Sequence, residues 1–396
     1  MQCGRPLLLR QPFPADAFDK VVLGCVNVIS DEMNPARVAA LRLGMGEEMQ
    51  ALTVQINCGS GMQSIDTAFK YIRHGEADLI LAGGTEALSH APLVFRKPAV
   101  EWFAGFAGAR SIWAKLRHLE KLKPGFFKPV IGLERGLTDP VVELNMGQTA
   151  ELLGHLFGIG RKEADTYAVA SHLRLSRAQE EGWLDGEVEP AFSRDGKVFE
   201  RDDGVRPDSS VETLAGLTPA FEPPYGKVTA GNSSQITDGA SWVILASESA
   251  VRRHKLEPRA IIRDSEWAAL DPSIMGLGPV LCATEILKRH GDGLDSIDLW
   301  EINEAFAAQV LSCLAAWQDE DFCKDQLGLD DAAGSIPEDR LNVDGGAISL
   351  GHPVGTSGNR IVLHLANAMR RLGLERGIAT ECIGGGQAGA MLLEAT

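Results

Sequence analysis

Two cysteines stand in settings that could activate a thiol. Cys58 lies in the sequence INCGSG at residues 56–61, and Cys382 lies in ECIGGG at residues 381–386, so each follows a short apolar stretch and runs into glycine. Backbone N–H groups exposed at such turns favour a thiolate and stabilise an oxyanion beside it. The alternative for Cys58 is a small buried apolar residue, but glycines at a helix start are costly unless the backbone approaches something closely. Two such thiols predict a reaction divided between them.

A histidine and an asparagine are further candidates. His352 lies in GHPVGTSG at residues 351–358, where it is either a general base near a thiol or a core histidine satisfied by its neighbours. Asn303 follows an expected strand over residues 297–302. It either caps a helix that begins at Glu304, which the local pattern favours, or holds a water or carbonyl oxygen in an oxyanion hole.

The elements around Cys58 follow a regular pattern. An expected strand at residues 53–56 leads through the Cys58 turn into a helix that ends near Gly75, and a second strand at 78–82 follows, closed by two glycines. The apolar face of the helix is formed by Met62, Ile65, Phe69 and Ile72. This unit of strand, turn, helix and strand is typical of α/β folds with a parallel sheet.

The C-terminal part repeats this pattern. The loop at residues 351–358 leads into a helix, and a strand at 378–383 then runs into three glycines. The apolar face of this helix is formed by Ile361, Leu365, Met369 and Leu372. The two parts therefore look like copies, which would bring Cys58 and the 351–358 loop to corresponding ends of two sheets packed together.

The composition excludes several classes of protein. The chain has 396 residues, 44% of them hydrophobic, and a net charge of −16, so it can bury a large core and is a poor match for a nucleic-acid binder. Its seven cysteines form no Cys-x-x-Cys pair, which disfavours a metal site or a disulfide framework and favours free thiols. No apolar run is long enough to span a membrane, and the start lacks a secretory signal. We therefore expect a cytoplasmic protein, with an organelle-targeting segment containing Arg5 and Arg10 as the alternative.

A basic stretch interrupts this acidic chain. Between Arg96 and Arg135, nine Lys or Arg residues stand against three Glu. The stretch is either a solvated amphipathic face or a site for an anionic, phosphate-bearing substrate. Signatures of other enzymes are absent, because no P-loop and no G-x-S-x-G elbow occur and GLG at residues 276–278 lacks the third glycine of a dinucleotide site.

Taken together, the motifs resemble the thiolase family in identity and order. The matching blocks are NCGSG at 57–61, NEAFA at 303–307, GHP at 351–353 with Gly355 and Gly358, and CIGGG at 382–386. Two further blocks look like family motifs, MGQTAE at 146–151 and TAGNSS at 229–234, so the likeness covers nearly all of residues 18–396. With this resemblance, catalysis becomes the favoured role of Asn303 and His352 the favoured base.

The resemblance implies an α/β fold of two duplicated βαβαβαββ halves that form a layered core, with an inserted loop domain that binds coenzyme A. We expect the N-terminal half at residues 1–95 and 235–250, the loop domain at 96–234 and the C-terminal half at 251–396. Family members begin with a strand and a helix before the segment that residues 18–24 resemble, and only 17 residues precede it here. We therefore expect the N-terminal strand and helix to be missing, and with them a central strand of the first sheet.

The resemblance also implies an acyl-CoA C-acyltransferase. Cys58 would attack the thioester of a 3-ketoacyl-CoA with His352 as its base, acetyl-CoA would leave an acyl-enzyme, and Cys382 would move the proton at the α-carbon. His352 and a water held by Asn303 would form one oxyanion pocket. The backbone amides of Cys58 and Gly384 would form the other.

The expected ligands and partners follow from that activity. Ser234 and Met146 would lie near coenzyme A, which is a substrate, so we expect no cofactor and no metal. The expected partners are acyl-CoA and coenzyme A, further copies of the chain in a homodimer or homotetramer, and a hydratase or dehydrogenase of fatty-acid oxidation, with no nucleic acid and no membrane span. Three alternatives remain: an enzyme that condenses two acetyl-CoA, a ketoacyl synthase, which Cys382 disfavours, and an inactive lipid-carrier or assembly subunit of the same fold.

Overall fold

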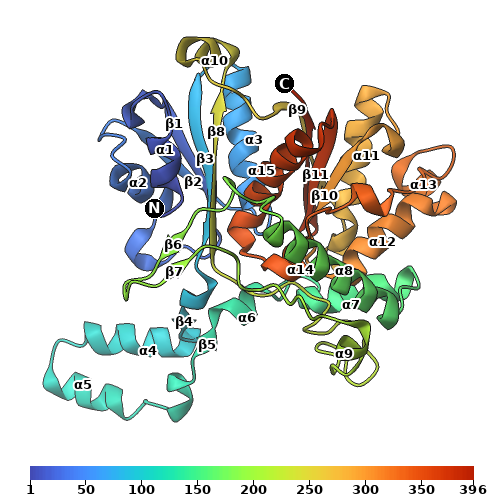
Figure 1. Ribbon diagram of the computed structural model, residues 1–396. Helices are drawn as coiled ribbons and strands as arrows, with labels where there is room; N and C mark the ends of the chain where they lie inside the picture. Colours follow the sequence, from blue (N-terminus) through green and yellow to red (C-terminus); the bar gives the residue numbers. More distant parts are fainter.

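Two four-stranded sheets form the core of the computed structural model, which describes residues 1–396 (Figure 1). The first sheet has the order β2-β1-β3-β8, with β1 at Lys20–Gly24, β2 at Gln50–Val54, β3 at Leu79–Glu86 and β8 at Gly239–Ala246. The second has the order β10-β11-β12-β9, with β9 at Ile261–Ala269, β10 at Leu299–Ile302, β11 at Arg376–Ile383 and β12 at Gln387–Glu394. The expected α/β fold is confirmed.

The two sheets repeat one pairing pattern. β1 pairs parallel with β2 and β3, and β3 pairs antiparallel with β8. In the second sheet β10 pairs parallel with β11, and β11 pairs antiparallel with β12, while a single parallel bridge between Trp300 and Leu341 takes the place of β2. β9 extends the second sheet as an edge strand antiparallel to β12, and the first sheet has no counterpart to it.

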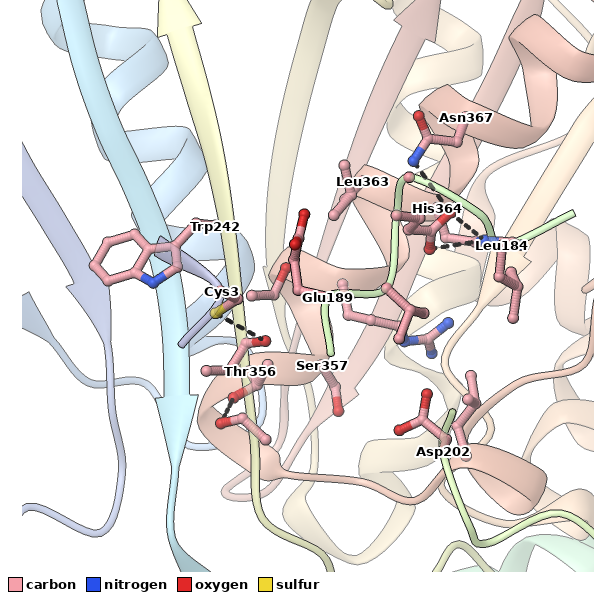
Figure 2. Close-up of a pocket in the computed structure, with 18 of the residues that line it drawn as sticks. Cys3, Leu184, Glu189, Asp202, Trp242, Thr356, Ser357, Leu363, His364 and Asn367 are labelled. Carbon is pink, nitrogen blue, oxygen red and sulfur yellow. Dashed lines mark hydrogen bonds and ion pairs between the residues drawn. The ribbon is translucent and has the colours of Figure 1, made fainter. Parts of the chain in front are cut away.

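The first sheet therefore lacks a strand, as expected, but the missing strand is an edge strand, so the expectation that it is a central one is wrong. Backbone hydrogen bonds run across all four strands of the first sheet without a gap, and the position equivalent to β9 is the outer edge of β8. A cavity of about 540 Å³ lies there, between β8, α15 (Val354–Leu372) and α1 (Gly4–Leu9). Figure 2 shows Cys3, Trp242, Thr356 and His364 around it. Neither Cys58 nor Cys382 lines this cavity.

Two central helices lie between the sheets. α3 (Ser60–Arg73) packs against α15, and Ile65, Ile361 and Leu365 are almost completely buried between them and the strands (Figure 1). The apolar stripe of each helix explains this position, because residues at i, i+3 and i+4 share one face. Gly75, with a positive φ of 72°, follows the end of α3 as expected. Leu372 is exposed because it is the last residue of α15.

Outer helices cover the far faces of both sheets (Figure 1). On the first sheet these are α2 (Pro35–Arg42) and α10 (Glu248–His254). On the second they are α11 (Gly278–His290) and α12 (Ala307–Gln318), and α13 (Glu320–Leu327) packs against α12. The result is a layered arrangement in which each sheet is covered by helices on both faces.

The glycines that were expected to close a strand lie inside it. β3 continues through Gly83 and Gly84 to Glu86, beyond the expected end at residue 82. A Cβ at Gly83 would lie 2.3 Å from the indole of Trp242, and one at Gly84 would lie 2.4 Å from the carbonyl oxygen of Gly355. These glycines therefore allow close packing and do not form a turn.

A long insertion separates β3 from β8. It contains α4 (Lys97–Gly108), α5 (Ile112–Leu119), α6 (Gly132–Gly136), α7 (Met146–Leu156), α8 (Arg161–Glu180) and α9 (Val211–Ala215), with the short strands β4 (Leu93–Val94), β5 (Val130–Ile131), β6 (Ala191–Phe192) and β7 (Val198–Phe199). α7 and α8 pack against α12, and α8 also contacts α14 (Ala347–Leu350). α4 and α5 project from the rest of the molecule as a hairpin (Figure 1). None of the helices has the length and hydrophobicity that a membrane crossing needs.

Candidate active site

Cys58 lies in the turn between β2 and α3. Asn57 adopts a left-handed backbone conformation with a φ of 47°, which asparagine tolerates better than most residues. The hydroxyl of Ser60 accepts a hydrogen bond from the Ile56 N–H at 2.9 Å and donates one to the Asn57 carbonyl at 2.7 Å. This turn holds the half-buried Cys58 just before the N-terminus of α3, where helix N–H groups point outwards.

The thiol of Cys58 is protonated at neutral pH, which differs from the expected thiolate. Burial raises the pKa of Cys58 to about 11, although the backbone N–H of Gly384 favours the thiolate and acts in the opposite direction. The effect of desolvation on the pKa therefore outweighs the opposite effect of the backbone N–H groups at the turn. A thiol in this state can act as a nucleophile only with a base that removes its proton.

Cys382 adjoins Cys58 from the second sheet. It is the penultimate residue of β11, is 2% exposed and packs in an apolar cluster with Met275, Phe306 and Ala150. Burial, and then the nearby charge that a Cys58 thiolate would carry, raise the pKa of Cys382 well above its usual range. A Cβ at Gly59, next to Cys58, would lie 2.3 Å from the side chain of Ile383, next to Cys382, so the segments that carry the two thiols are in contact. Cys382 rests in its protonated form.

A hydrogen bond joins the turns that hold these cysteines. The side-chain amide of Asn57 donates to the carbonyl oxygen of Gly384 at 2.7 Å. The N–H of Gly384 in turn favours a thiolate at Cys58. Met146 packs beside this turn, since its sulfur lies 3.2 Å from the position of a Cβ at Gly384. This contact places Met146, which was expected to lie near coenzyme A, at the candidate site.

Glycines allow the two halves to meet at this point. A Cβ at Gly59 would lie 2.3 Å from the Ile383 side chain, and one at Gly61 would lie 2.6 Å from the Asn359 backbone nitrogen. A Cβ at Gly358 would lie 2.1 Å from the carboxylate of Glu381. The N-termini of α3 and α15 therefore approach each other, and the end of β11, more closely than larger residues would permit.

His352 is held at the start of α15 with one ring nitrogen free. Its Nδ1 lies 2.6 Å from the hydroxyl of Ser357, which donates to the carbonyl of Pro353 at 3.4 Å, and its backbone N–H donates to Gln235 at 2.8 Å. The Ser357 oxygen therefore accepts a hydrogen bond from the Nδ1–H of His352. Nε2, which is buried without a partner, carries no proton and can act as a base. Burial, with a contribution from the charge of Arg360, lowers the pKa of His352 to about 4. The imidazole is neutral at physiological pH.

Asn303 does not cap a helix. α12 begins at Ala307, and the Asn303 backbone instead extends β10 by donating to the carbonyl of Thr380 at 2.9 Å. Both polar atoms of the Asn303 side chain are buried without a hydrogen-bond partner. Because buried amides are normally hydrogen-bonded, this side chain is free to bind a water or a substrate oxygen.

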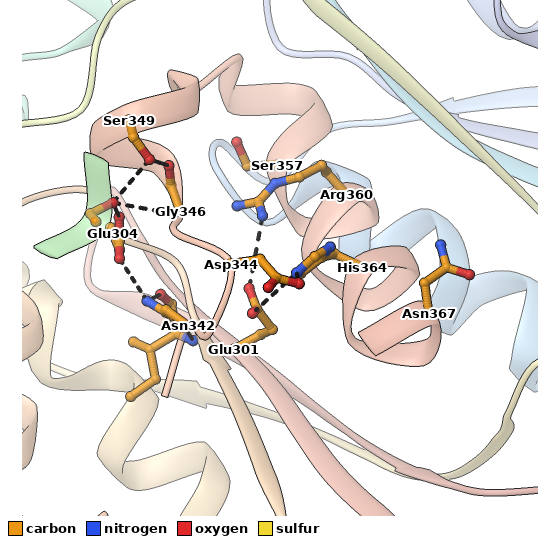
Figure 3. Close-up of polar contacts among 12 residues, drawn as sticks. Glu301, Glu304, Asn342, Asp344, Gly346, Ser349, Ser357, Arg360, His364 and Asn367 are labelled. Atoms are coloured by element: carbon orange, nitrogen blue, oxygen red, sulfur yellow. Dashed lines mark hydrogen bonds and ion pairs between the residues drawn. The ribbon is translucent and has the colours of Figure 1, made fainter. Parts of the chain in front are cut away.

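A buried carboxylate positions Asn303 and the loop before His352. Glu304 accepts hydrogen bonds from Tyr167 at 3.0 Å, Ser171 at 2.6 Å and Asn342 at 3.0 Å. Figure 3 shows the contact with Asn342. The Ile348 N–H donates to the same carboxylate at 3.2 Å. This network joins α8, β10 and α14, so it acts as a rigid support for the candidate site. Nothing in the local sequence pattern indicated it.

The remaining expected residues differ in position. Ser234 is half-buried, and its backbone N–H donates to the carbonyl of Ala305 at 3.0 Å, which brings it beside the Asn303 segment. The basic stretch lies largely on the projecting α4–α5 hairpin, away from both sheets (Figure 1). Asn57 and Ser357 were missed by the sequence analysis. Their only signals were an asparagine directly before the cysteine and a serine five residues after the histidine.

Comparisons with known proteins agree with this geometry. The family model for the thiolase N-terminal domain matches residues 2–249, and the model for the thiolase C-terminal domain matches residues 256–395. A 3-ketoacyl-CoA thiolase of Aliivibrio fischeri is 38% identical over 395 residues, covering 98% of this chain and 90% of that protein. A beta-ketoadipyl-CoA thiolase of Pseudomonas aeruginosa is also 38% identical, covering 96% of this chain and 88% of its own.

Solved structures show the same likeness. Human mitochondrial 3-ketoacyl-CoA thiolase in complex with CoA has a TM-score of 0.84 and 36% identity, covering 99% of this chain and 90% of that one. The acetyl-CoA acetyltransferase of Bacillus anthracis has a TM-score of 0.84 and 34% identity, covering 100% of this chain and 92% of that one. Sequence and structure agree over the whole chain, which therefore belongs to the thiolase family of acyltransferases.

Proposed function

We propose that this thiolase cleaves 3-ketoacyl-CoA with coenzyme A into acetyl-CoA and a shortened acyl-CoA, through an acyl-enzyme on Cys58. The single observation that carries the proposal is that the turn with Cys58 packs against the end of β11 with Cys382, so that two thiols from the two halves meet at one junction. Thiolysis of a carbon–carbon bond needs both a nucleophile and a separate proton donor for the carbon that leaves.

The first half-reaction follows from the balance of electrons. The bond that must break joins C2 and C3, so Cys58 adds to the keto carbon C3. This corrects the expectation from the sequence, which had Cys58 attack the thioester carbonyl. Nε2 of His352 takes the thiol proton as the sulfur–carbon bond forms. The electron pair of the C2–C3 bond stays on C2, Cys382 donates its proton there, and acetyl-CoA leaves.

The second half-reaction returns the enzyme to its resting state. The Cys382 thiolate takes the thiol proton of coenzyme A, whose sulfur attacks the acyl group on Cys58. The bond between Cys58 and the acyl carbon breaks, His352 returns its proton to that sulfur, and the shortened acyl-CoA leaves. All three groups regain the protonation states that their pKa values favour at neutral pH.

Two polar pockets would stabilise the developing charges. The unpartnered amide of Asn303 and, once it has taken the Cys58 proton, the Nε2–H of His352 suit one oxyanion, because both groups are buried and free to donate a hydrogen bond. The N–H of Gly384, which favours a thiolate at Cys58, suits the other. Coenzyme A would act as a substrate beside Met146 and Ser234, and the chemistry needs no further cofactor or metal.

A second candidate function is the condensation of two acetyl-CoA to acetoacetyl-CoA, which uses the same groups in reverse. The likeness to the acetyl-CoA acetyltransferase of Bacillus anthracis favours it. We favour thiolysis in fatty-acid oxidation, because the Aliivibrio fischeri and human relatives are both named 3-ketoacyl-CoA thiolase. Assembly into a homodimer or homotetramer, and association with a hydratase or dehydrogenase, belong to the same proposal.

One experiment tests the function directly. The protein is incubated with 3-ketoacyl-CoAs of increasing length, with and without coenzyme A, and the peptide that contains Cys58 is weighed by mass spectrometry. We expect an acyl adduct on Cys58 without coenzyme A and turnover with it, and the preferred length gives the substrate. Cys3→Ala, which removes a distant half-buried thiol, is the matched control. An adduct on another cysteine, or none with any substrate including acetyl-CoA, would refute the proposal and favour the inactive subunit.

A further inference from the structure

The projecting hairpin is built around its own small core. We call residues 97–128, which contain α4 and α5, the arm. Trp102 stacks on Phe106 with ring centroids 5.4 Å apart, and its indole N–H donates to the His118 carbonyl at 2.9 Å. Phe126 closes the cluster, with its ring 6.4 Å from that of Trp102. No residue of the arm belongs to the apolar cores of the two sheets.

The arm exposes a large set of apolar side chains. On α5, Ile112, Leu116 and Leu119 follow one another at helical spacing and form a stripe, and Trp113 beside them is 72% exposed. The full set is Val100, Phe103, Ile112, Trp113, Leu116, Leu119 and Phe127. No other part of the chain covers these side chains. Seven exposed apolar residues gathered on one hairpin mark an interaction surface.

The arm is also basic in an acidic protein. It carries Lys97, Arg110, Lys115, Arg117, Lys121, Lys123 and Lys128 against two glutamates, Glu101 and Glu120. Its net charge is therefore +5, while the whole chain carries −16, so the remainder carries −21. An anionic surface would therefore attract the arm and repel the rest of the molecule.

We propose that the arm binds an anionic lipid surface. Tryptophan, phenylalanine and leucine next to lysine and arginine are the composition of interfacial helices, whose apolar side chains enter the acyl boundary while their cations contact lipid head groups. Lys115 and Arg117 lie between Trp113 and Leu119 on α5, so both groups are presented together. A nucleic acid would pair with the cations of the arm but would leave its apolar stripe exposed to water. A second copy of the arm would cover the apolar stripe, but the positive charges of the two arms would repel each other.

Vesicle binding by the full chain tests this proposal. The protein is sedimented with phosphatidylcholine vesicles, with and without phosphatidylglycerol, at low and high salt. We expect binding only to the anionic vesicles, weakened by salt because screening reduces the attraction between exposed charges. Trp113→Glu, and separately the pair Lys121→Glu and Lys123→Glu, should each weaken binding by about tenfold or more.

A matched control separates this effect from a general change of the surface. Phe199→Glu replaces an exposed aromatic residue on β7, outside the arm, and should leave binding unchanged. Melting temperatures equal to that of the wild type show that each variant is folded. Equal binding to neutral vesicles, no binding to either kind, or unchanged binding by both arm variants would overturn the proposal. A smaller sedimentation coefficient of Trp113→Glu without lipid would also overturn it, since the arm would then be an interface between copies of the chain.

Discussion

The side-chain amide of Asn57 donates a 2.7 Å hydrogen bond to the carbonyl oxygen of Gly384 and so holds in place the residue whose own N–H favours a thiolate at Cys58. Asn57→Asp keeps the shape of the side chain but cannot donate this bond. We expect kcat to fall by about 10²-fold, the usual cost of a misplaced oxyanion donor. Steady-state kinetics with a 3-ketoacyl-CoA measure the effect.

The control for this change is Asn34→Asp, which likewise removes an amide donor, here of the 3.2 Å hydrogen bond to the Ala51 carbonyl, while aspartate still caps α2. It should leave kcat unchanged. If Asn57→Asp retains the wild-type kcat, the orientation of Gly384 does not depend on Asn57.

Substitution of each cysteine should stop a different step. Cys58→Ala should abolish acyl-enzyme formation, whereas Cys382→Ala should still become acylated by acetyl-CoA but should no longer exchange the methyl protons of acetyl-CoA with water. The reason is that only Cys382 is expected to exchange a proton with C2. Mass spectrometry follows the first reaction and proton NMR in heavy water the second. Exchange at the wild-type rate by Cys382→Ala would contradict the assigned roles.

The neutral state of His352 predicts an unusual pH profile. With a pKa lowered to about 4, the imidazole stays an unprotonated base through the mildly acidic range. We therefore expect kcat/KM for thiolysis to remain level from pH 7 down to about pH 5. A profile that loses activity with an apparent pKa near 6.5 would show that His352 is not the buried base described here.

Ser357 is a positioning residue for His352. Ser357→Ala removes the acceptor of the Nδ1 proton, so the ring is free to rotate or change tautomer. We expect kcat to fall about 10-fold with little change in KM, and the acidic limb of the pH profile to move. Ser357→Thr keeps the hydroxyl and should restore most of the activity. Equal loss in both variants would indicate a packing defect and no role in positioning.

The contact between α3 and α15 predicts a large steric cost at Gly61. A Cβ there would lie 2.6 Å from the Asn359 backbone nitrogen and 2.8 Å from the Thr356 carbonyl oxygen, and backbone atoms cannot move aside easily. Gly61→Ala should lower the free energy of unfolding by about 3 kcal/mol. Gly108→Ala, at another helical glycine with no atom within 4 Å of its Cβ position, should not. Denaturant titrations of both variants decide the point, and equal stabilities would contradict the close approach.

A buried histidine predicts how stability depends on pH. His364 lies between the carboxylates of Glu187 at 3.0 Å, Asp344 at 3.3 Å and Glu301 at 3.8 Å. Figure 3 shows the last two beside the imidazole. Burial alone would lower the pKa of His364, but these three carboxylates outweigh it and raise the pKa well above 6.5. The stabilising contribution is therefore complete below pH 6.5 and is lost as the pH rises through the higher folded-state value.

The test compares His364→Asn with the wild type. The variant should unfold at a lower temperature near pH 6.5, with a loss of about 3 kcal/mol in the free energy of unfolding, and the difference should shrink in more alkaline buffer. His74→Asn, at an exposed histidine, should show no difference at either pH. A gap that stays constant over the alkaline range would contradict a charged His364.

Much of the site could be predicted from local sequence because its groups lie in short motifs. The turns at Cys58 and Cys382, the helices after Cys58 and His352, and the duplication of the two halves all follow from the spacing of glycines and apolar residues. The motifs also predicted the thiolase family, which the comparisons confirm. These features depend on residues close together in the chain, where periodicity and turn preferences act.

Only the tertiary structure determined how those groups are charged and supported. The raised pKa of Cys58, the lowered pKa of His352 and the unpartnered amide of Asn303 result from burial by distant segments, and the Glu304 network joins residues far apart in sequence. The missing strand is an edge strand and not a central one, and the local pattern that favoured Asn303 as a cap was wrong, because strand order and helix starts are set by long-range packing. Desolvation and sheet order depend on the whole fold, so neither can be read from neighbours along the chain.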